Sequence, residues 1–175
     1  SQWLGMGRDL MKIPIFAETI QELHDILMLK ANGFDLMSLI CSDDPEKFSN
    51  ILNSYVGIIG IEIGLVNILK ALEITPDHIV GHSLGETACA YADRSFTAEQ
   101  AILVAHARGE SSDEVKNTAG AMAAVGMSYQ ELEKILPNDI DIACHNNSDS
   151  TTISGAAEKV REFIELLKNQ TIFVR

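Results

Sequence analysis

The chain has 175 residues, of which 46% are hydrophobic and 22% charged, a balance typical of a globular protein that buries a core. Its formal net charge of −12 disfavours nucleic acid and anionic membrane surfaces as partners. The three cysteines are widely spaced and form no C-x-x-C pair, which argues against a disulfide framework or a zinc site. We therefore expect reduced thiols, no metal and a cytoplasmic location.

The first part of the chain is predicted to be mostly helical. Apolar residues recur at helical spacing along residues 20–30, which predicts an amphipathic helix. Residues 48–72 form a longer apolar stretch, but Glu62 lies within one membrane thickness and would be costly there. We therefore predict a central buried helix and no membrane span.

Residues 78–80 are predicted to form a strand that leads into the sequence G-H-S-L-G and then into a helix. This order fits the G-x-S-x-G nucleophile elbow, with Ser83 as the nucleophile. The turn is so tight that neighbouring side chains would collide, so both Gly81 and Gly85 are expected to be required. The alternative is an ordinary serine in a glycine-containing loop.

A serine nucleophile needs a general base within hydrogen-bond reach. Four histidines are predicted to be structural, surface or packing residues: His24, His78, His82 and His106. His145 lies in a polar turn after a predicted strand, and this position makes it the candidate base among the histidines. Turns rich in Asn and Ser also contain histidine for local hydrogen bonding, so both interpretations stay open.

The second part of the chain changes pattern near residue 120. Before it, Thr97 and Gln100 predict a capping box and a helix that carries Arg108. After it, the predicted order is strand, helix, two strands around a polar turn, helix and a last strand in T-I-F-V-R. This βαββαβ order is that of a ferredoxin-like subdomain. We expect two domains, 1–119 and 120–175.

Five segments, SQWLGMGRDLM, GHSLGE, ARGE, GAMAAVG and ACHNNSDSTTISG, occur in this order. Together they resemble the acyltransferase domain of fatty acid and polyketide synthases, most of all the malonyl/acetyltransferase domain of animal-type fatty acid synthase. The resemblance extends over residues 1–175. It implies an α/β fold with an α/β-hydrolase-like large subdomain, incomplete here, and an inserted ferredoxin-like subdomain.

The resemblance also assigns roles to residues. It implies that Ser83 is the acylated nucleophile and that the backbone N–H of Leu84 contributes to the oxyanion hole. Arg108 would hold the free carboxylate of a malonyl group, for which a guanidinium offers two parallel donors. The alternative for Arg108 is a surface salt bridge. His145 and Asn146 would line the cleft, and neither would be the base.

The implied reaction transfers a malonyl or acetyl group from CoA to the phosphopantetheine thiol of an acyl carrier protein. CoA thioesters are then substrates, no bound cofactor is expected, and a neighbouring ketosynthase is an expected partner. Arg8, Lys12 and Lys116 are candidates to receive the CoA phosphates. The family's catalytic histidine is expected beyond Arg175 and its second oxyanion donor before Ser1.

Two other functions remain open at this point. A thioesterase-like serine hydrolase would use the same elbow, although such enzymes lead into it through several strands. The chain would otherwise be a non-catalytic fragment of a synthase, because the expected histidine is absent from it. Without that histidine, we expect the isolated chain to be inactive or very weak.

Overall fold

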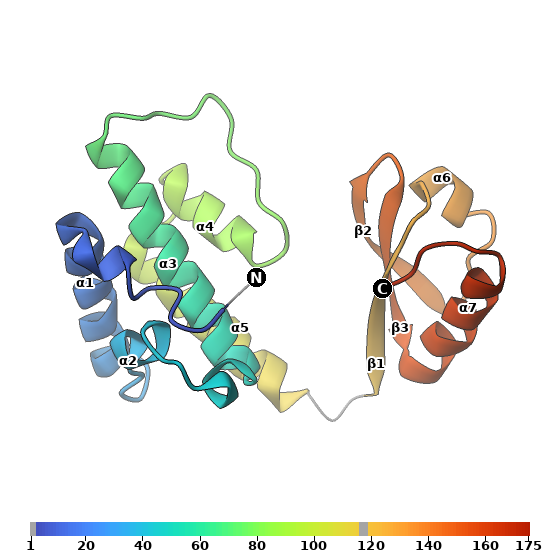
Figure 1. Ribbon diagram of the computed structural model, residues 1–175, viewed down its shortest axis with the longest axis horizontal. Coiled ribbons are helices and arrows are strands. Elements are labelled where there is room, and N and C mark those ends of the chain that lie inside the picture. The colour runs from blue at the N-terminus through green and yellow to red at the C-terminus, as the bar shows by residue number, and fades with distance from the viewer. Residues whose placement is uncertain (1–2, 116–118) are drawn as a thin grey trace. The chain divides into compact units, whose positions relative to one another are not determined.

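The computed structural model describes residues 3–115 and 119–175, and the chain divides into two compact units (Figure 1). Unit 1 is Ser1–Val115 and unit 2 is Lys116–Arg175. The division lies near Gly120, where the sequence pattern changes. Each unit has its own cluster of buried apolar side chains, and each is described separately below.

Unit 1 is helical throughout its described residues. Its α-helices are α1 (Pro14–Lys30), α2 (Leu36–Ile40), α3 (Ile51–Ala71), α4 (Gly85–Ala92) and α5 (Ala98–Glu114), with short 3₁₀ turns η1 (Leu10–Lys12) and η2 (Pro45–Phe48). The helices predicted at 20–30 and 48–72 are confirmed. The first begins earlier than predicted, at Pro14, since proline suits the first helical position.

Helix α3 is the centre of unit 1 and packs against α1, α4 and α5. By length and composition alone it would qualify as a membrane span. Its Gly64 is buried, and a Cβ there would overlap the fully buried ring of Phe16 on α1. This close approach of two helix backbones is the packing of a core helix.

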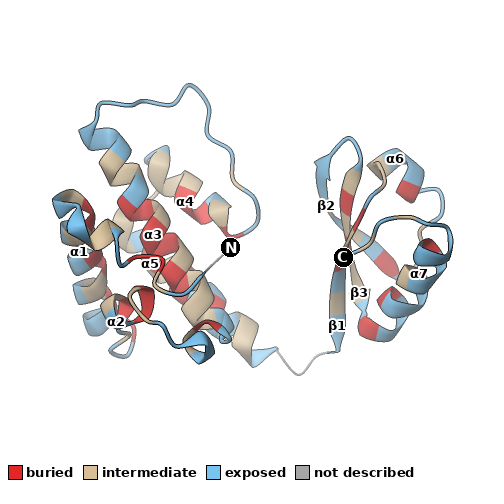
Figure 2. Cartoon of the chain, in the orientation of Figure 1, coloured by how far each residue is buried: buried red, intermediate tan, exposed pale blue. Residues whose placement is uncertain are grey.

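The segment between α3 and α4 differs from the prediction. Residues 78–80 form no strand, although the backbone follows an extended path around the end of α3 (Figures 1 and 2). A strand requires a neighbour to pair with its N–H and C=O groups, and no described residue supplies one. Val80 is consequently 94% exposed.

Unit 2 contains β1 (Gly120–Val125), α6 (Tyr129–Leu132), β2 (Ile140–Asn147), β3 (Ser150–Ala156) and α7 (Ala157–Asn169). The strands form an antiparallel sheet in the order β1-β3-β2. The predicted strand–helix–strand–strand–helix order is confirmed. In place of the predicted last strand there is a bridge between Val174 and Val125, with three backbone hydrogen bonds between residues 124–126 and 173–175.

Candidate functional site

The candidate site is the sharp turn at Ser83, directly before α4. Ser83 has φ of +54°, a region that residues other than glycine rarely adopt. Two backbone bonds close the turn: the N–H of Gly85 donates to the carbonyl of His82 at 3.0 Å, and that of Glu86 to the carbonyl of Ser83 at 3.2 Å. The turn leaves Ser83 exposed. The predicted elbow geometry is therefore present, without the strand predicted before it.

The two glycines of the motif have different surroundings. A Cβ on Gly81 would lie 2.7 Å from the sulfur of Cys89, the nitrogen of Glu86 and the carbonyl carbon of Gly85. A Cβ on Gly85 would meet no described atom within 4 Å. The prediction that both glycines are required is thus right for Gly81 and wrong for Gly85, because Gly85 opens α4 on a side that faces open space.

Donor groups for a developing negative charge are available at this turn. Within residues 3–115 and 119–175, the backbone N–H of Leu84 has no hydrogen-bond acceptor. Leu84 precedes the first turn of α4, where the helix dipole favours negative charge. Its side chain is only 8% exposed, which anchors this amide. The oxyanion-hole role of Leu84 stays a prediction.

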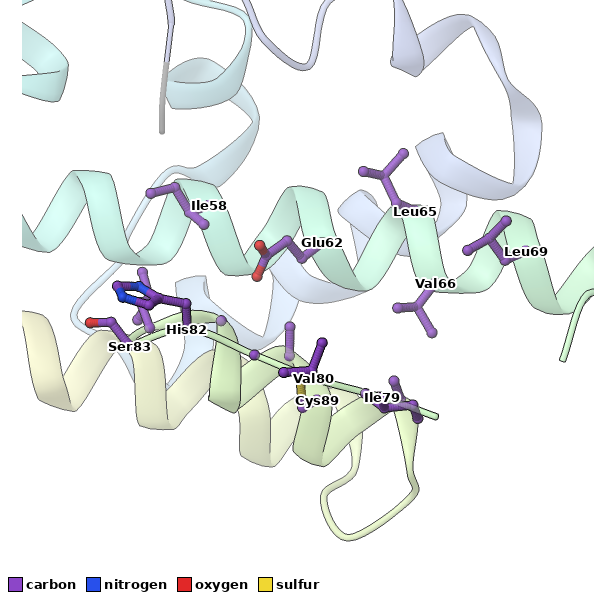
Figure 3. Close-up of a pocket in the computed structure, with 15 residues that line it drawn as sticks. Ile58, Glu62, Leu65, Val66, Leu69, Ile79, Val80, His82, Ser83 and Cys89 are labelled. Atoms are coloured by element: carbon purple, nitrogen blue, oxygen red, sulfur yellow. The ribbon is translucent and has the colours of Figure 1, made fainter. Parts of the chain in front are cut away.

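An open apolar groove of about 670 Å³ lies beside the turn, between α3 and the extended segment (Figure 3). In Figure 3 the hydroxyl of Ser83 lies at one end of the groove and points away from Leu65, Val66 and Leu69. The groove is lined mostly by aliphatic side chains, among them Ile58, Leu65, Val66, Leu69, Ile79 and Val80. The Ser83 hydroxyl therefore points away from the end of the groove lined by Leu65, Val66 and Leu69.

Three ionisable residues line the groove: His82 in the turn, Glu62 on α3 and Cys89 on α4 (Figure 3). Burial raises the pKa of Glu62 above its ordinary value of 4.5. Its buried Oε2 has no hydrogen-bond partner in the described part of the chain. Burial also raises the pKa of the Cys89 thiol, and the negative charge of Glu62 adds to this effect. The sequence marked Glu62 only as a costly membrane residue.

Arg108 lies on α5, as predicted, with an exposed side chain. Its Nη1 donates a hydrogen bond to Oγ1 of Thr87 on α4 at 3.2 Å. Its Cζ lies 5.9 Å from the centroid of the Tyr55 ring on α3. No described carboxylate forms a salt bridge with Arg108, although the chain has 25 acidic residues. The surface salt bridge considered above is therefore not found here.

Thr87 and Tyr55 were missed by the sequence analysis. Ser83 lies before α4 with a left-handed backbone, so the four-residue spacing to Thr87 does not place the two on one helix face. Ser83 is exposed and Thr87 is buried, and the contact of Thr87 with Arg108 follows only from the packing of α4 against α5. Tyr55 carried no signal, since its proximity to Arg108 arises only from the packing of α3 against α5.

The remaining candidates lie in unit 2. His145 and Asn146 are on β2, in a stretch where the pairing with β3 is irregular. The ring of His145 is 5.9 Å from that of Tyr129, and Nδ2 of Asn146 donates to Oγ1 of Thr152 at 2.9 Å. Their role as cleft-lining residues stays a prediction.

The Ser83 hydroxyl has no hydrogen-bond partner among the described residues, so none of them is placed to act as its base. His106 is buried with its ring edge against Phe34, which confirms a packing role. His24 Nδ1 lies 3.5 Å from Asp35. In the same residues, no cluster of three or more His, Cys, Asp or Glu is arranged to hold a metal ion.

Two of the three cations predicted for CoA are already engaged in ion pairs. Arg8 forms an ion pair with Asp43 at 2.7 Å, and Lys12 forms one with Asp9 at 2.6 Å. Lys116 lies outside the described residues. Arg108 differs from Arg8 and Lys12, because it has no acidic partner among the described residues.

Sequence comparison gives matches along the full chain. A family model for the acyl transferase domain matches residues 1–175. The chain is 35% identical to the highly reducing polyketide synthase SAT13 of Stachybotrys chartarum, over 100% of the chain. It is 36% identical to the highly reducing polyketide synthase sphB of Aspergillus fumigatus, over 96% of the chain. It spans only 8% and 7% of these two proteins.

Solved structures match as well. The acyltransferase domain of the polyketide synthase PpsC of Mycobacterium tuberculosis has a TM-score of 0.88 at 28% identity, over 99% of this chain and 53% of that one. The malonyl CoA-acyl carrier protein transacylase of Coxiella burnetii has a TM-score of 0.87 at 27% identity, over 100% of this chain and 57% of that one. These matches confirm the predicted α/β fold class.

Proposed function

The chain belongs to the acyl transferase domain family, and from this premise we propose that it moves malonyl and acetyl groups from CoA to the phosphopantetheine thiol of an acyl carrier protein. The observation that carries the malonyl part is the exposed guanidinium of Arg108. In a chain with a net charge of −12, it has no carboxylate partner among the described residues. A free carboxylate on the substrate would supply that partner.

The proposed reaction has two half-reactions at one serine. The Ser83 oxygen attacks the thioester carbonyl, the C–S bond breaks, and CoA leaves as the thiol. The pantetheine thiol then attacks the acyl ester, which transfers the acyl group and restores the Ser83 hydroxyl. The Leu84 N–H would stabilise the oxyanion in both steps. We propose that a histidine beyond Arg175, as the family resemblance implies, accepts the serine proton.

The parent protein is proposed to be a cytoplasmic multidomain synthase in which this domain works beside a ketosynthase and a carrier protein. The polyketide synthases reported above support a polyketide parent, since they match the chain over nearly its full length. The fatty acid synthase expected from the sequence motifs stays a prediction. Both parents would use the same acyl-serine chemistry.

The decisive experiment follows the acyl group in the full-length protein. Radiolabelled malonyl-CoA or acetyl-CoA is added, the reaction is stopped, and the labelled peptide is identified by mass spectrometry. We expect label on Ser83, its transfer to added carrier protein, and none in Ser83→Ala. Release of free acid in place of transfer would support the hydrolase alternative, and the absence of any label would support the non-catalytic one. The isolated chain should acylate far more slowly.

The role of Arg108 is tested by Arg108→Ala in the same protein. The variant should lower kcat/KM for malonyl-CoA by roughly 100-fold, since hydrogen bonds to a charged group contribute about 1.5–3 kcal/mol. Acetyl-CoA has no free carboxylate, so its kcat/KM should fall much less. An equal loss with both substrates would contradict the assignment of Arg108 to the malonyl carboxylate.

A further inference from the structure

We propose that Thr87 is a positioning residue that sets the preference for carboxylated acyl groups by holding the Arg108 guanidinium in place. The inference rests on the proposed function, because it assumes that Arg108 receives the substrate carboxylate. Thr87 would then determine how well Arg108 binds the substrate carboxylate. Neither the motifs nor the comparisons assign a role to Thr87.

The contact between the two side chains is the first support. Oγ1 of Thr87 accepts the hydrogen bond from Arg108 Nη1 at 3.2 Å. Thr87 is 5% exposed, so its hydroxyl lies where water does not easily compete for the bond. Because threonine is branched at Cβ, χ1 of the side chain is restricted and the acceptor is held in one direction.

The second support is that three helices meet around the guanidinium. Thr87 comes from α4, Arg108 from α5, and Tyr55 on α3 places its ring centroid 5.9 Å from Arg108 Cζ. These three helices pack against one another in pairs. A cation over an aromatic face is attracted to it, so the ring and the hydroxyl together restrain the plane of the guanidinium.

The backbone beneath Arg108 is also fixed. The next residue, Gly109, is buried, and a Cβ there would lie 2.7 Å from Cα of Leu52 on α3. Glycine at this position lets α5 approach α3 closely beside Arg108. The base and the tip of the Arg108 side chain are therefore both held, and a long side chain that is held before binding loses less freedom when the ligand arrives.

The guanidinium keeps donors for a ligand after it bonds to Thr87. It has five N–H donors in a rigid fork, and the described residues take one of them through Thr87. Thr87 is neutral, so it orients the cation without neutralising it. A carboxylate at the same position would have competed with the substrate. A threonine therefore suits a residue that must position an arginine and leave its charge available.

The test measures substrate preference in the full-length protein with matched variants. Thr87→Val keeps the shape and removes the acceptor, while Thr87→Ser keeps the hydroxyl. Thr19→Val is the matched control: Thr19 is also 5% exposed, and its hydroxyl donates to the carbonyl of Ile15 on α1 and accepts from Asn67 on α3, with neither bond involving Arg108. For each variant, kcat and KM are measured with malonyl-CoA and with acetyl-CoA, and the melting temperature is recorded.

We expect Thr87→Val to lower the malonyl-to-acetyl ratio of kcat/KM by about 3- to 10-fold, the effect of ordering one long side chain upon binding. The loss should appear in KM for malonyl-CoA. Thr87→Ser should restore most of the ratio. Thr19→Val should lower the melting temperature without changing the ratio.

The other outcomes separate the two proposals. If Arg108→Ala removes the malonyl preference but Thr87→Val keeps it, the positioning role is wrong and the proposed function stands. If Arg108→Ala leaves the ratio unchanged, the assignment of Arg108 itself fails. If Thr87→Val lowers both activities equally with the melting temperature, Thr87 only joins α4 to α5 and the inference is refuted. Thr87→Ala replaces the valine variant if that one does not fold.

Discussion

Replacing Gly81 with alanine should damage the elbow, whereas the same change at Gly85 should not, although the two glycines hold equivalent places in the motif. The new Cβ at position 81 would lie 2.7 Å from three atoms, and real Cβ atoms essentially never come within 3.0 Å of a neighbour. Two of those atoms belong to the backbone of Gly85 and Glu86. Relief of the overlap therefore requires the start of α4 to move, and Ser83 moves with it.

The expected changes in stability and in reaction rate follow from these contacts. Overpacking of this kind typically costs about 1–3 kcal/mol. A displacement of the nucleophile by about 1 Å lowers a rate by roughly 100-fold. At Gly85 no described atom lies within 4 Å of the added Cβ, and alanine is favoured over glycine within a helix by up to about 1 kcal/mol. Gly85→Ala should thus be neutral or slightly stabilising.

The two variants are compared in the full-length protein by two measurements. Hydrogen exchange of peptides covering residues 81–92 reports the local stability, and 1–3 kcal/mol corresponds to roughly 5- to 150-fold faster exchange. The rate of labelling of Ser83 by malonyl-CoA reports the position of its hydroxyl. Gly81→Ala should change both and Gly85→Ala neither by more than a few-fold. Equal damage by both changes would refute the steric reasoning.

Three further predictions concern other described features. Glu62→Gln should stabilise the protein at neutral pH by up to about 1 kcal/mol. Because the pKa of Glu62 is raised in the folded state, its protonated form favours folding at low pH, and this contribution is lost as the pH rises through the folded pKa. The gain from the glutamine should therefore vanish near pH 4 in melting experiments. Alkylation of Cys89 at pH 8, followed by mass spectrometry, should be slower than that of a free thiol and faster in Glu62→Gln, since burial and Glu62 raise its pKa. Thr97→Ala removes the bond that Thr97 Oγ1 accepts from the backbone N–H of Gln100 at 3.1 Å, and it should destabilise α5 by about 1 kcal/mol in hydrogen exchange.

Elements specified by nearby residues were predicted well from the sequence. The capping box of Thr97 and Gln100 forms with both hydrogen bonds, and so does that of Ser128 and Glu131. Each joins residues within one helical turn, so the pattern contains all the groups that make the structure. The turn at Ser83 belongs to the same class, because the motif itself contains the residues that close it.

Features that depend on distant residues were not predictable in the same way. Ile79 and Val80 favour an extended backbone, but a strand also needs a partner, which no local pattern supplies. Gly81 and Gly85 are identical letters, and only the packing around them shows that one is enclosed and the other open. The bond from Arg108 to Thr87 joins residues on different helices, so it follows from how α4 and α5 pack.

The backbone at Ser83 is supported by packing as well as by the two hydrogen bonds that close the turn. A left-handed backbone at a residue other than glycine costs about 1–2 kcal/mol, and Ser83 keeps it because its neighbours are fixed on both sides. On one side, Gly81 lies against α4 with no room for a side chain. On the other, Leu84 and Ala88 are each 8% exposed and belong to the core of unit 1. A core substitution that loosens Leu84 should let the turn at Ser83 relax to an ordinary conformation, and activity would then fall before the unit unfolds.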